Sequence, residues 1–358
     1  MNIFELIDKI IEQRASDLHL VAGAAPAFRI DGIMTFLPGE KLKPDEVKTM
    51  CYELLDDERR NKFEKENELD FSYSYFSKTH ELFCRFRVNL YLQRGSVALA
   101  LRFINNKIQT FTELHLPPVI KDIARQRRGL ILVTGATGSG KSTTLATLVD
   151  LINTERSCHI VTLEDPIEFF HTHKKSLVSQ REIGHDTASF SLALREALRQ
   201  DPDVLLVGEM RDLETISIAI TAAETGHLVL GTLHTTDAVQ TIDRIIDVFP
   251  PHQQQQIRTQ ISITLQAVIA QQLVLKSDGK GRLAAVEVMV VTPAIRNLVR
   301  EGKTYQIYSV IEMGREQGMQ TLDQALQHLI SQRLIAASEA FQVTRDPENL
   351  KKKLEISG

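Results

Sequence analysis

The first hundred residues show the strict alternation of apolar and polar positions that is typical of half-buried β-strands. Three segments carry it: ELDFSYSYF (68–76), CRFRVNLYL (84–92) and SVALALRFI (96–104). The last two are separated only by a short glycine-containing segment, so they are predicted to form a hairpin. In the segment 84–92 the apolar face is expected to hold Phe86, Val88, Leu90 and Leu92, with Arg85 and Arg87 on the opposite face.

Beyond residue 128 the pattern changes to short, continuously apolar runs, each with helix-patterned sequence close by. Four such runs cover residues 129–135, 158–165, 203–209 and 226–234. This alternation of strands and helices predicts a parallel sheet covered by helices. A late strand is predicted at 282–292, and the sequence from Pro293 onward is mainly helical in its spacing.

These two patterns predict an α/β protein with two domains and a helical end. We expect an N-terminal α/β domain at 1–104, a linker at 105–117 and an α/β core at 118–292. The remainder, 293–358, is expected to be a helical C-terminal region.

Composition is ordinary for a globular protein, with 43% hydrophobic and 25% charged residues among 358. No apolar run approaches the roughly 18 residues of a membrane span, and the N-terminus lacks the pattern of a signal peptide. We therefore expect a cytoplasmic protein. The three cysteines, Cys51, Cys84 and Cys158, are too few and too scattered to predict a disulfide framework or a zinc site.

The net charge of −4 provides no general attraction for nucleic acid. The basic segments KDIARQRR (121–128) and KKK (351–353) lack the interleaved aromatic residues of a single-strand binding surface. We interpret both as solvated surface or subunit contacts and predict no nucleic-acid partner.

The segment GATGSGKS (135–142) matches the phosphate-binding loop motif in full. It follows an apolar strand and precedes a helix-forming run, which is the context that the motif requires. The predicted nucleotide-binding residues are Gly135, Ala136, Thr137, Gly138, Ser139, Gly140, Lys141, Ser142 and Thr143. Lys141 is expected to reach the β- and γ-phosphates of ATP, and Ser142 to hold Mg²⁺.

A second acidic strand, DVLLVGE (203–209), is expected to end with Glu209 at the carboxyl edge of the sheet. The position that often holds a magnesium-associated aspartate is occupied by Gly208. Glu209 is therefore a candidate to polarise the attacking water or to contact Mg²⁺ indirectly, through the water bound to the ion. The alternative is a surface acid at the end of a strand.

Three further acids, Glu164, Asp165 and Glu168, follow the strand at 158–165. Clustered carboxylates at the end of a strand suit the organisation of a metal ion and a water molecule, whereas Asp-Pro also starts turns. We assign Glu164 a catalytic role and Asp165 a structural one.

Two histidines, His227 and His234, lie at the two ends of a buried strand. Their separation of seven residues places them on opposite faces, so a shared metal site is not expected. His234 ends the strand beside polar residues and is a candidate to sense the γ-phosphate. A lone histidine is more often structural, and His227 is the weaker candidate.

Four arginines of the first domain, Arg85, Arg87, Arg94 and Arg102, are candidate arginine fingers that act on the nucleotide of a neighbouring subunit. Arginines on strand surfaces are also commonly just solvated. Strand alternation assigns each side chain to a face but gives no distance to a nucleotide.

Six segments together resemble the type II/IV secretion superfamily of hexameric ATPases, over nearly the whole chain and in the order of the family. They are ASDLHL (15–20), GATGSGKST (135–143), TLEDPIEF (162–169), ALRQDPDVLLVGEMRD (197–212), ETGHLVLGTLHTTDA (224–238) and AIRNLVREGK (294–303).

The resemblance implies an N-terminal PAS-like α/β domain followed by a RecA-like P-loop ATPase domain, assembled into a homohexamer. It also implies that Glu164, Glu209 and His234 join Lys141 and Ser142 in the active site, and the family pattern includes the glycine at position 208. Arginines of the N-terminal domain are then expected to help close a site that lies between the two domains.

Within the superfamily the chain resembles the motors that retract type IV pili, because AIRNLVREGK is similar to a signature of retraction motors. Extension motors are similar but longer and carry a four-cysteine zinc motif. The resemblance implies ATP hydrolysis with Mg²⁺, a location at the inner membrane beneath the pilus, and an inner-membrane platform protein as partner. An accessory retraction ATPase is expected as a further partner, and the chain could itself be that accessory enzyme.

Two other classes of function stay open at this point. One is a nucleic-acid translocase on the same RecA-like fold, which the negative net charge disfavours. The other is a regulatory ring that binds ATP but hardly hydrolyses it, which the presence of both Glu164 and Glu209 disfavours.

Overall fold

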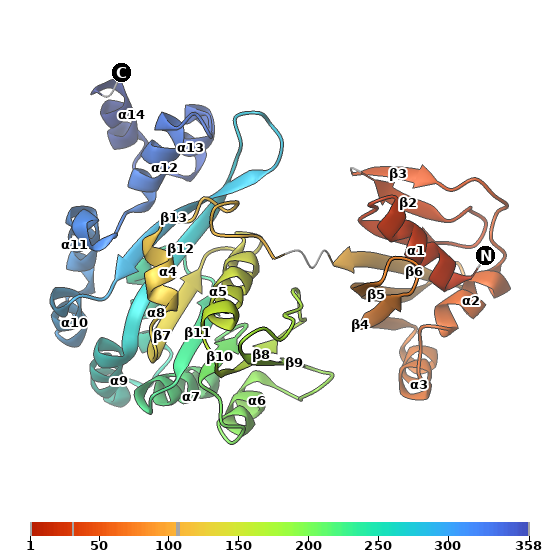
Figure 1. The fold of residues 1–358 in the computed structure, drawn as a ribbon, viewed down its shortest axis with the longest axis horizontal. Helices are drawn as coiled ribbons and strands as arrows, with labels where there is room; N and C mark the ends of the chain where they lie inside the picture. Colours follow the sequence, from red (N-terminus) through yellow and green to blue (C-terminus); the bar gives the residue numbers. More distant parts are fainter. Residues whose placement is uncertain (1, 31, 105–107, 357–358) are drawn as a thin grey trace. The chain divides into compact units, whose positions relative to one another are not determined.

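The computed structural model describes residues 2–30, 32–104 and 108–356, and it divides into two compact units. The first unit comprises residues 1–107 and the second residues 108–358. Each unit has its own hydrophobic core. Figure 1 shows the helices and strands of each unit.

The first unit is an antiparallel sheet of order β3-β2-β1-β6-β5-β4 that packs against helices. Its strands are β1 (Asp17–Leu20), β2 (Ala27–Ile30), β3 (Ile33–Phe36), β4 (Glu68–Ser77), β5 (Leu82–Gln93) and β6 (Ser96–Ile104). Its helices are α1 (Ile3–Glu12), α2 (Pro44–Tyr52) and α3 (Asp57–Glu66).

The three strands and the hairpin predicted in this unit are confirmed, with one error in the predicted core. Phe86, Val88 and Leu90 of β5 are fully buried beside the apolar face of α1. Leu92 belongs to the same face of the strand, but 43% of its surface is exposed. It lies next to the hairpin turn at Arg94 and Gly95, whereas Val97, its partner across the hairpin, remains in the core.

The second unit is built on a seven-stranded sheet of order β13-β12-β7-β11-β10-β8-β9. Neighbouring strands are parallel except for β12 and β13, which form an antiparallel pair. The strands are β7 (Gly129–Thr134), β8 (His159–Glu164), β9 (Leu177–Glu182), β10 (Val204–Val207), β11 (Leu228–Leu233), β12 (Leu265–Leu275) and β13 (Arg282–Val290).

Helices cover both faces of this sheet (Figure 1). Along β7, Leu130 and Leu132 belong to one apolar cluster and Ile131 and Val133 to another, which is the alternation expected of a strand buried on both faces. The helices are α4 (Val119–Ala124), α5 (Lys141–Glu155), α6 (Phe190–Ala197), α7 (Leu213–Glu224), α8 (Ala238–Asp247), α9 (Pro251–Thr264), α10 (Pro293–Arg300), α11 (Ile307–Met313), α12 (Leu322–Ser331), α13 (Ala337–Val343) and α14 (Pro347–Ile356).

The sequence patterns miss some of this architecture. The strands β9 and β12 are not predicted, and the late strand β13 is antiparallel to its neighbour because it pairs with β12 through a hairpin. Part of the expected linker, 108–117, packs on the second unit, where Phe111 and Leu116 are buried. The expected linker residues 105–107 and the last two residues, 357–358, lie outside the described residues.

The parallel strands bring distant segments of the chain to one edge of the sheet. The order β7-β11-β10-β8 places the carboxyl ends of these four strands side by side. The phosphate-binding loop follows β7, Glu164 ends β8, Glu209 follows β10 and His234 follows β11. Ligands of open α/β sheets bind at this edge.

Candidate functional site

The phosphate-binding loop closes around two positions where a side chain does not fit. Gly135 has a φ of 141°, and a Cβ there would lie 2.4 Å from the backbone oxygen of Gln271. Gly140 has a φ of 89° and precedes the first turn of α5. The loop therefore leads directly into a helix N-terminus, whose backbone N–H groups and partial positive charge attract phosphate.

Lys141 opens α5 and folds back over the loop. Its Nζ donates to the carbonyl oxygens of Gly135 and Ala136 at 2.8 and 3.0 Å. Burial lowers the pKa of Lys141, while the negative charges of Glu209 and Glu168 act in the opposite direction. The ammonium group therefore lies among acids at the mouth of a phosphate loop, where it can pair with the terminal phosphates of ATP.

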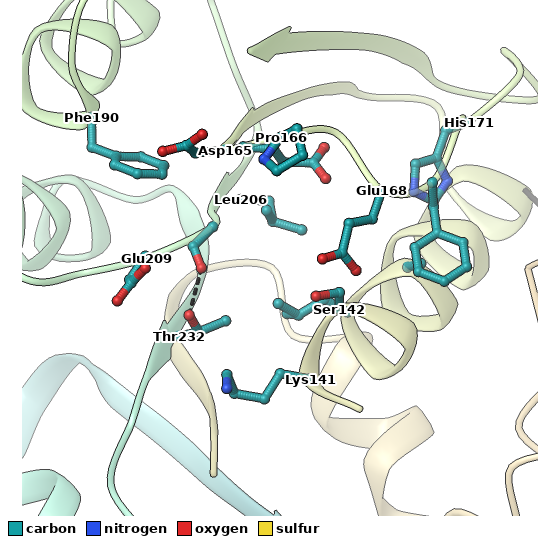
Figure 2. Close-up of a pocket in the computed structure, with 15 residues that line it drawn as sticks. Lys141, Ser142, Asp165, Pro166, Glu168, His171, Phe190, Leu206, Glu209 and Thr232 are labelled. Carbon is teal, nitrogen blue, oxygen red and sulfur yellow. Dashed lines mark hydrogen bonds between the residues drawn. The ribbon is translucent and has the colours of Figure 1, made fainter. Parts of the chain in front are cut away.

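A pocket beside this loop is lined by four of the predicted site residues. Lys141, Ser142, Glu164 and Glu209 all line it. Figure 2 shows Lys141 and Ser142 below the acids Glu168 and Glu209. Thr143 follows in the first turn of α5, where its carbonyl oxygen accepts a hydrogen bond from Thr147 within the helix. The remaining loop residues, Ala136, Thr137 and Gly138, are exposed.

Gln271, which was not predicted from the sequence, binds the phosphate-binding loop from the neighbouring strand β12. The side chain of Gln271, on β12, is buried, and its Nε2 donates to the carbonyl oxygen of Ser139 at 2.7 Å. Its Oε1 accepts from the hydroxyl of Thr144 at 3.0 Å. The glutamines that interrupt the apolar segment LQAVIAQQLVL (265–275) were the signal that could have identified it.

Replacing Gln271 by leucine is expected to weaken ATP binding about tenfold. The substitution leaves a buried carbonyl and a buried hydroxyl without their partner, which costs about 1–3 kcal/mol and loosens the loop. Titration with a fluorescent ATP analogue measures the affinity. Gln272→Leu is the matched control because the next residue of a strand points to the opposite face. An affinity equal in Gln271→Leu and wild type would contradict the assigned contact.

Glu209 and His234, predicted from separate segments, are in direct contact. The Nε2 of His234 lies 2.8 Å from Oε1 of Glu209, and Arg211 donates to the same oxygen through Nε. Burial raises the pKa of Glu209, but the hydrogen bond from Arg211 and the charge of His234 outweigh it and leave the pKa below its ordinary value. Glu209 is therefore ionised at neutral pH.

The glycine before Glu209 is explained by close packing. A Cβ at Gly208 would lie 2.9 Å from the carbonyl oxygen of Leu163 and 3.3 Å from the Cα of Glu164. The carbonyl oxygen of Gly208 accepts a hydrogen bond from Thr232 (Figure 2). An aspartate at this position would require β8 and β10 to move apart.

Glu164 ends β8 in a less polar environment than Glu209. Burial raises its pKa to about 7, although hydrogen bonds from Thr162 and Gln180 act against the rise. The hydroxyl of Thr162 donates to Oε1 of Glu164 at 2.7 Å, and Nε2 of Gln180 donates to the same oxygen at 3.2 Å. Two carboxylates in one pocket with pKa values shifted apart are typical of a division between an ionised group and a proton acceptor.

The loop after β8 adds further residues to the pocket. Asp165, joined to Pro166 by a cis peptide bond, Glu168 and His171 all line it. Burial lowers the pKa of His171 to about 4, so this histidine is neutral at pH 7. His171 was missed because its segment, FFHTHKK (169–175), matches no motif considered from the sequence.

The two histidines of the segment 226–234 are separated as predicted. Nδ1 of His227 lies 3.0 Å from the carbonyl oxygen of Ala222 at the end of α7, a structural contact. His234 reaches Glu209 instead, and Asp237 caps the helix α8 that follows it. The buried Glu287 accepts from the backbone N–H of Ala238 at 2.9 Å and anchors the start of the same helix.

The four candidate arginines lie on β5, β6 and the hairpin turn of the first unit. Arg102 pairs with Asp17 at 2.8 Å, and Arg87 pairs with Asp70. Arg85 donates to the hydroxyl of Ser74, while Arg94 lies exposed in the turn. Their role at a nucleotide stays a prediction.

The residues of the pocket fit a magnesium–nucleotide complex. The buried hydroxyl of Ser139 has no hydrogen-bond partner among the described residues, as expected of a loop built to surround a ligand. Ser142 and the carboxylate of Glu209 line the neighbouring pocket. Hydroxyl and carboxylate oxygens are the ligands that Mg²⁺ prefers.

Comparison with known families identifies one match that covers nearly the whole chain. Residues 2–342 match the family described as type II/IV secretion system protein. The chain is 49% identical over 349 residues to PilT of Pseudomonas aeruginosa, a type IV pilus retraction ATPase, with 98% of this chain and all of that protein covered. It is 39% identical to the type IV pilus ATPase PilU of the same organism, with 95% and 88% covered.

A crystal structure of the pilus retraction motor PilT with bound ADP has the same fold. The superposition gives a TM-score of 0.90 at 48% sequence identity and covers 98% of this chain and 99% of the other. The expected α/β fold, an N-terminal domain followed by an ATPase domain, is confirmed.

Proposed function

Since the chain belongs to the type II/IV secretion system protein family, we propose that it is the ATPase that powers retraction of type IV pili. The observation that carries the proposal is the pocket in which Lys141, Ser142, Glu164 and Glu209 meet. An enzyme with these groups can bind a triphosphate and activate water. The higher identity to PilT than to PilU favours the retraction motor over the accessory ATPase.

The residues divide the reaction among them. The loop 135–143 binds the phosphates of ATP, Lys141 neutralises the β- and γ-phosphates, and Ser142 holds Mg²⁺, which supplies charge neutralisation when bound. Glu164 accepts the proton of the attacking water, because its pKa of about 7 matches neutral pH. Glu209 remains ionised and orients the water or the hydration shell of Mg²⁺, and His234 links it to the γ-phosphate.

The mechanical step needs more than one domain and more than one subunit. In this proposal six copies form a ring, and Arg85, Arg87, Arg94 and Arg102 supply the candidate fingers that close the nucleotide site. Loss of the γ-phosphate then lets one domain swing against the other. The work passes to a platform protein in the inner membrane, with the motor bound peripherally on the cytoplasmic side and an accessory retraction ATPase as a second partner.

One structural finding bears on that location. Within the described residues the structure has no helix that is both long and apolar enough to cross a bilayer. We propose that the platform partner holds the motor at the pilus base, and we propose no nucleic-acid partner.

A direct phosphate-release assay on the purified full chain tests the proposed reaction. We expect Mg²⁺-dependent ATP turnover that added DNA does not change, because the net charge of −4 offers no general attraction for phosphodiester backbones. Strong stimulation by DNA would favour a nucleic-acid translocase. ATP binding without phosphate release would favour a regulatory ring.

A further inference from the structure

The loop 165–171, which lines the pocket, is held by two side chains of the neighbouring edge strand β9. The Oε2 atom of Glu182 accepts from the backbone N–H of Ile167 at 3.0 Å. Gln180 accepts from the N–H of His171 through Oε1 at 2.8 Å and donates Nε2 to the carbonyl oxygen of Phe169 at 2.8 Å. Because they are two residues apart on a strand, Gln180 and Glu182 face the same side.

The same carboxamide also reaches the acid that ends β8. Strand pairing places Gln180 opposite Thr162, and both side chains donate to Oε1 of Glu164, at 3.2 and 2.7 Å. The backbone N–H of Glu168 also donates to the Glu164 carboxylate. A carboxylate with three donors is held in one orientation, as a proton acceptor in a reaction requires.

We propose that Gln180 is a positioning residue for ATP hydrolysis, which fixes the Glu164 carboxylate and the loop 165–171 in a single geometry. Glu164 and Glu168 line the pocket, whereas Gln180 stands behind them and acts through Glu164. The inference rests on the proposed role of Glu164 as the group that accepts the proton.

The isosteric change Gln180→Glu distinguishes a role of Gln180 in positioning Glu164 from a role in filling space. It keeps the acceptor for the N–H of His171 but replaces Nε2, which donates to Glu164 and to the carbonyl oxygen of Phe169, by a second carboxylate oxygen. A like charge beside Glu164 raises the pKa of that acid further, so the acid limb of the pH profile of kcat should move to higher pH. At pH 7 we expect kcat to fall about 10-fold to 100-fold. The KM for ATP should change less than about threefold, because the phosphate loop is untouched.

A double-mutant cycle tests whether Gln180 acts through Glu164. In a wild-type background Gln180→Leu should lower kcat, whereas in a Glu164→Gln background it should lower kcat little further. Ser179→Ala is the matched control, since it removes a contact of the same strand, with His159, on the other face. This control should keep the wild-type pH profile.

The pH readout remains valid if part of a variant misfolds, because the midpoint of a normalised pH profile does not depend on the amount of active enzyme. An acid limb of Gln180→Glu at the wild-type position would overturn the inference. Full additivity of Gln180→Leu with Glu164→Gln would overturn it as well. Wild-type turnover measured in the same series tests the proposed ATPase function separately.

Discussion

Replacing Lys141 by alanine is expected to lower ATP turnover about 1,000-fold or more. The ammonium group is the positive charge that the phosphate loop directs at the leaving and transferred phosphates, and its loss leaves their developing charge uncompensated. In the structure Nζ of Lys141 is held at the loop by the carbonyl oxygens of Gly135 and Ala136. Phosphate release from the purified variant measures the effect.

Lys121→Ala is the control for this variant. Lys121 lies on α4 over the ring of Phe111 and is not part of the pocket lining, so its removal should leave turnover unchanged. If a clean preparation of Lys141→Ala still turns over ATP at the wild-type rate, the pocket around the phosphate loop is not the site of hydrolysis.

The second large effect is expected for Glu164→Gln, which should lower kcat about 100-fold to 10,000-fold with ATP still bound. The amide keeps the size of the side chain but cannot accept the proton of the attacking water. Wild-type kcat should rise through pH 7 as Glu164 loses its proton, since burial raises its pKa to about 7. In Glu164→Gln this rise should disappear, and a pH series of initial rates measures both effects.

The control is Glu155→Gln, the same chemical change at an exposed glutamate. Glu155 lies at the C-terminal end of α5, away from the phosphate loop, and pairs with Arg125. It should keep both the rate and the pH profile of wild type. If Glu164→Gln retained the acid limb of the profile, another group would be the proton acceptor, and Glu209 would be tested next.

Much of the candidate site follows from local sequence. A phosphate loop between an apolar strand and a helix fixes its own geometry, so the loop from Gly135 to Ser142 can be placed from the motif and its flanking segments alone. Glu164, Glu209 and His234 each end a strand of one parallel sheet, and parallel strands bring their carboxyl ends to the same edge. The contact of His234 with Glu209 is a consequence of that edge.

The supporting residues could not be found in this way. Gln271 reaches the phosphate loop only because β12 lies next to β7, and Gln180 reaches Glu164 only because β9 lies next to β8. Strand alternation assigns a side chain to a face, whereas the neighbour on that face depends on the order of strands in the sheet. The strands β9 and β12 were themselves not predicted, so their polar side chains had no place in the predicted site.

The central claim is that hydrolysis in this pocket drives retraction of the pilus. Fluorescent labelling of pili on living cells, with the native gene replaced by Glu164→Gln or by wild type, tests it most directly. The account predicts that cells with the variant extend pili that stay long and do not retract, while wild-type cells retract theirs. Pili that retract normally in the Glu164→Gln cells, at normal protein levels, would contradict it.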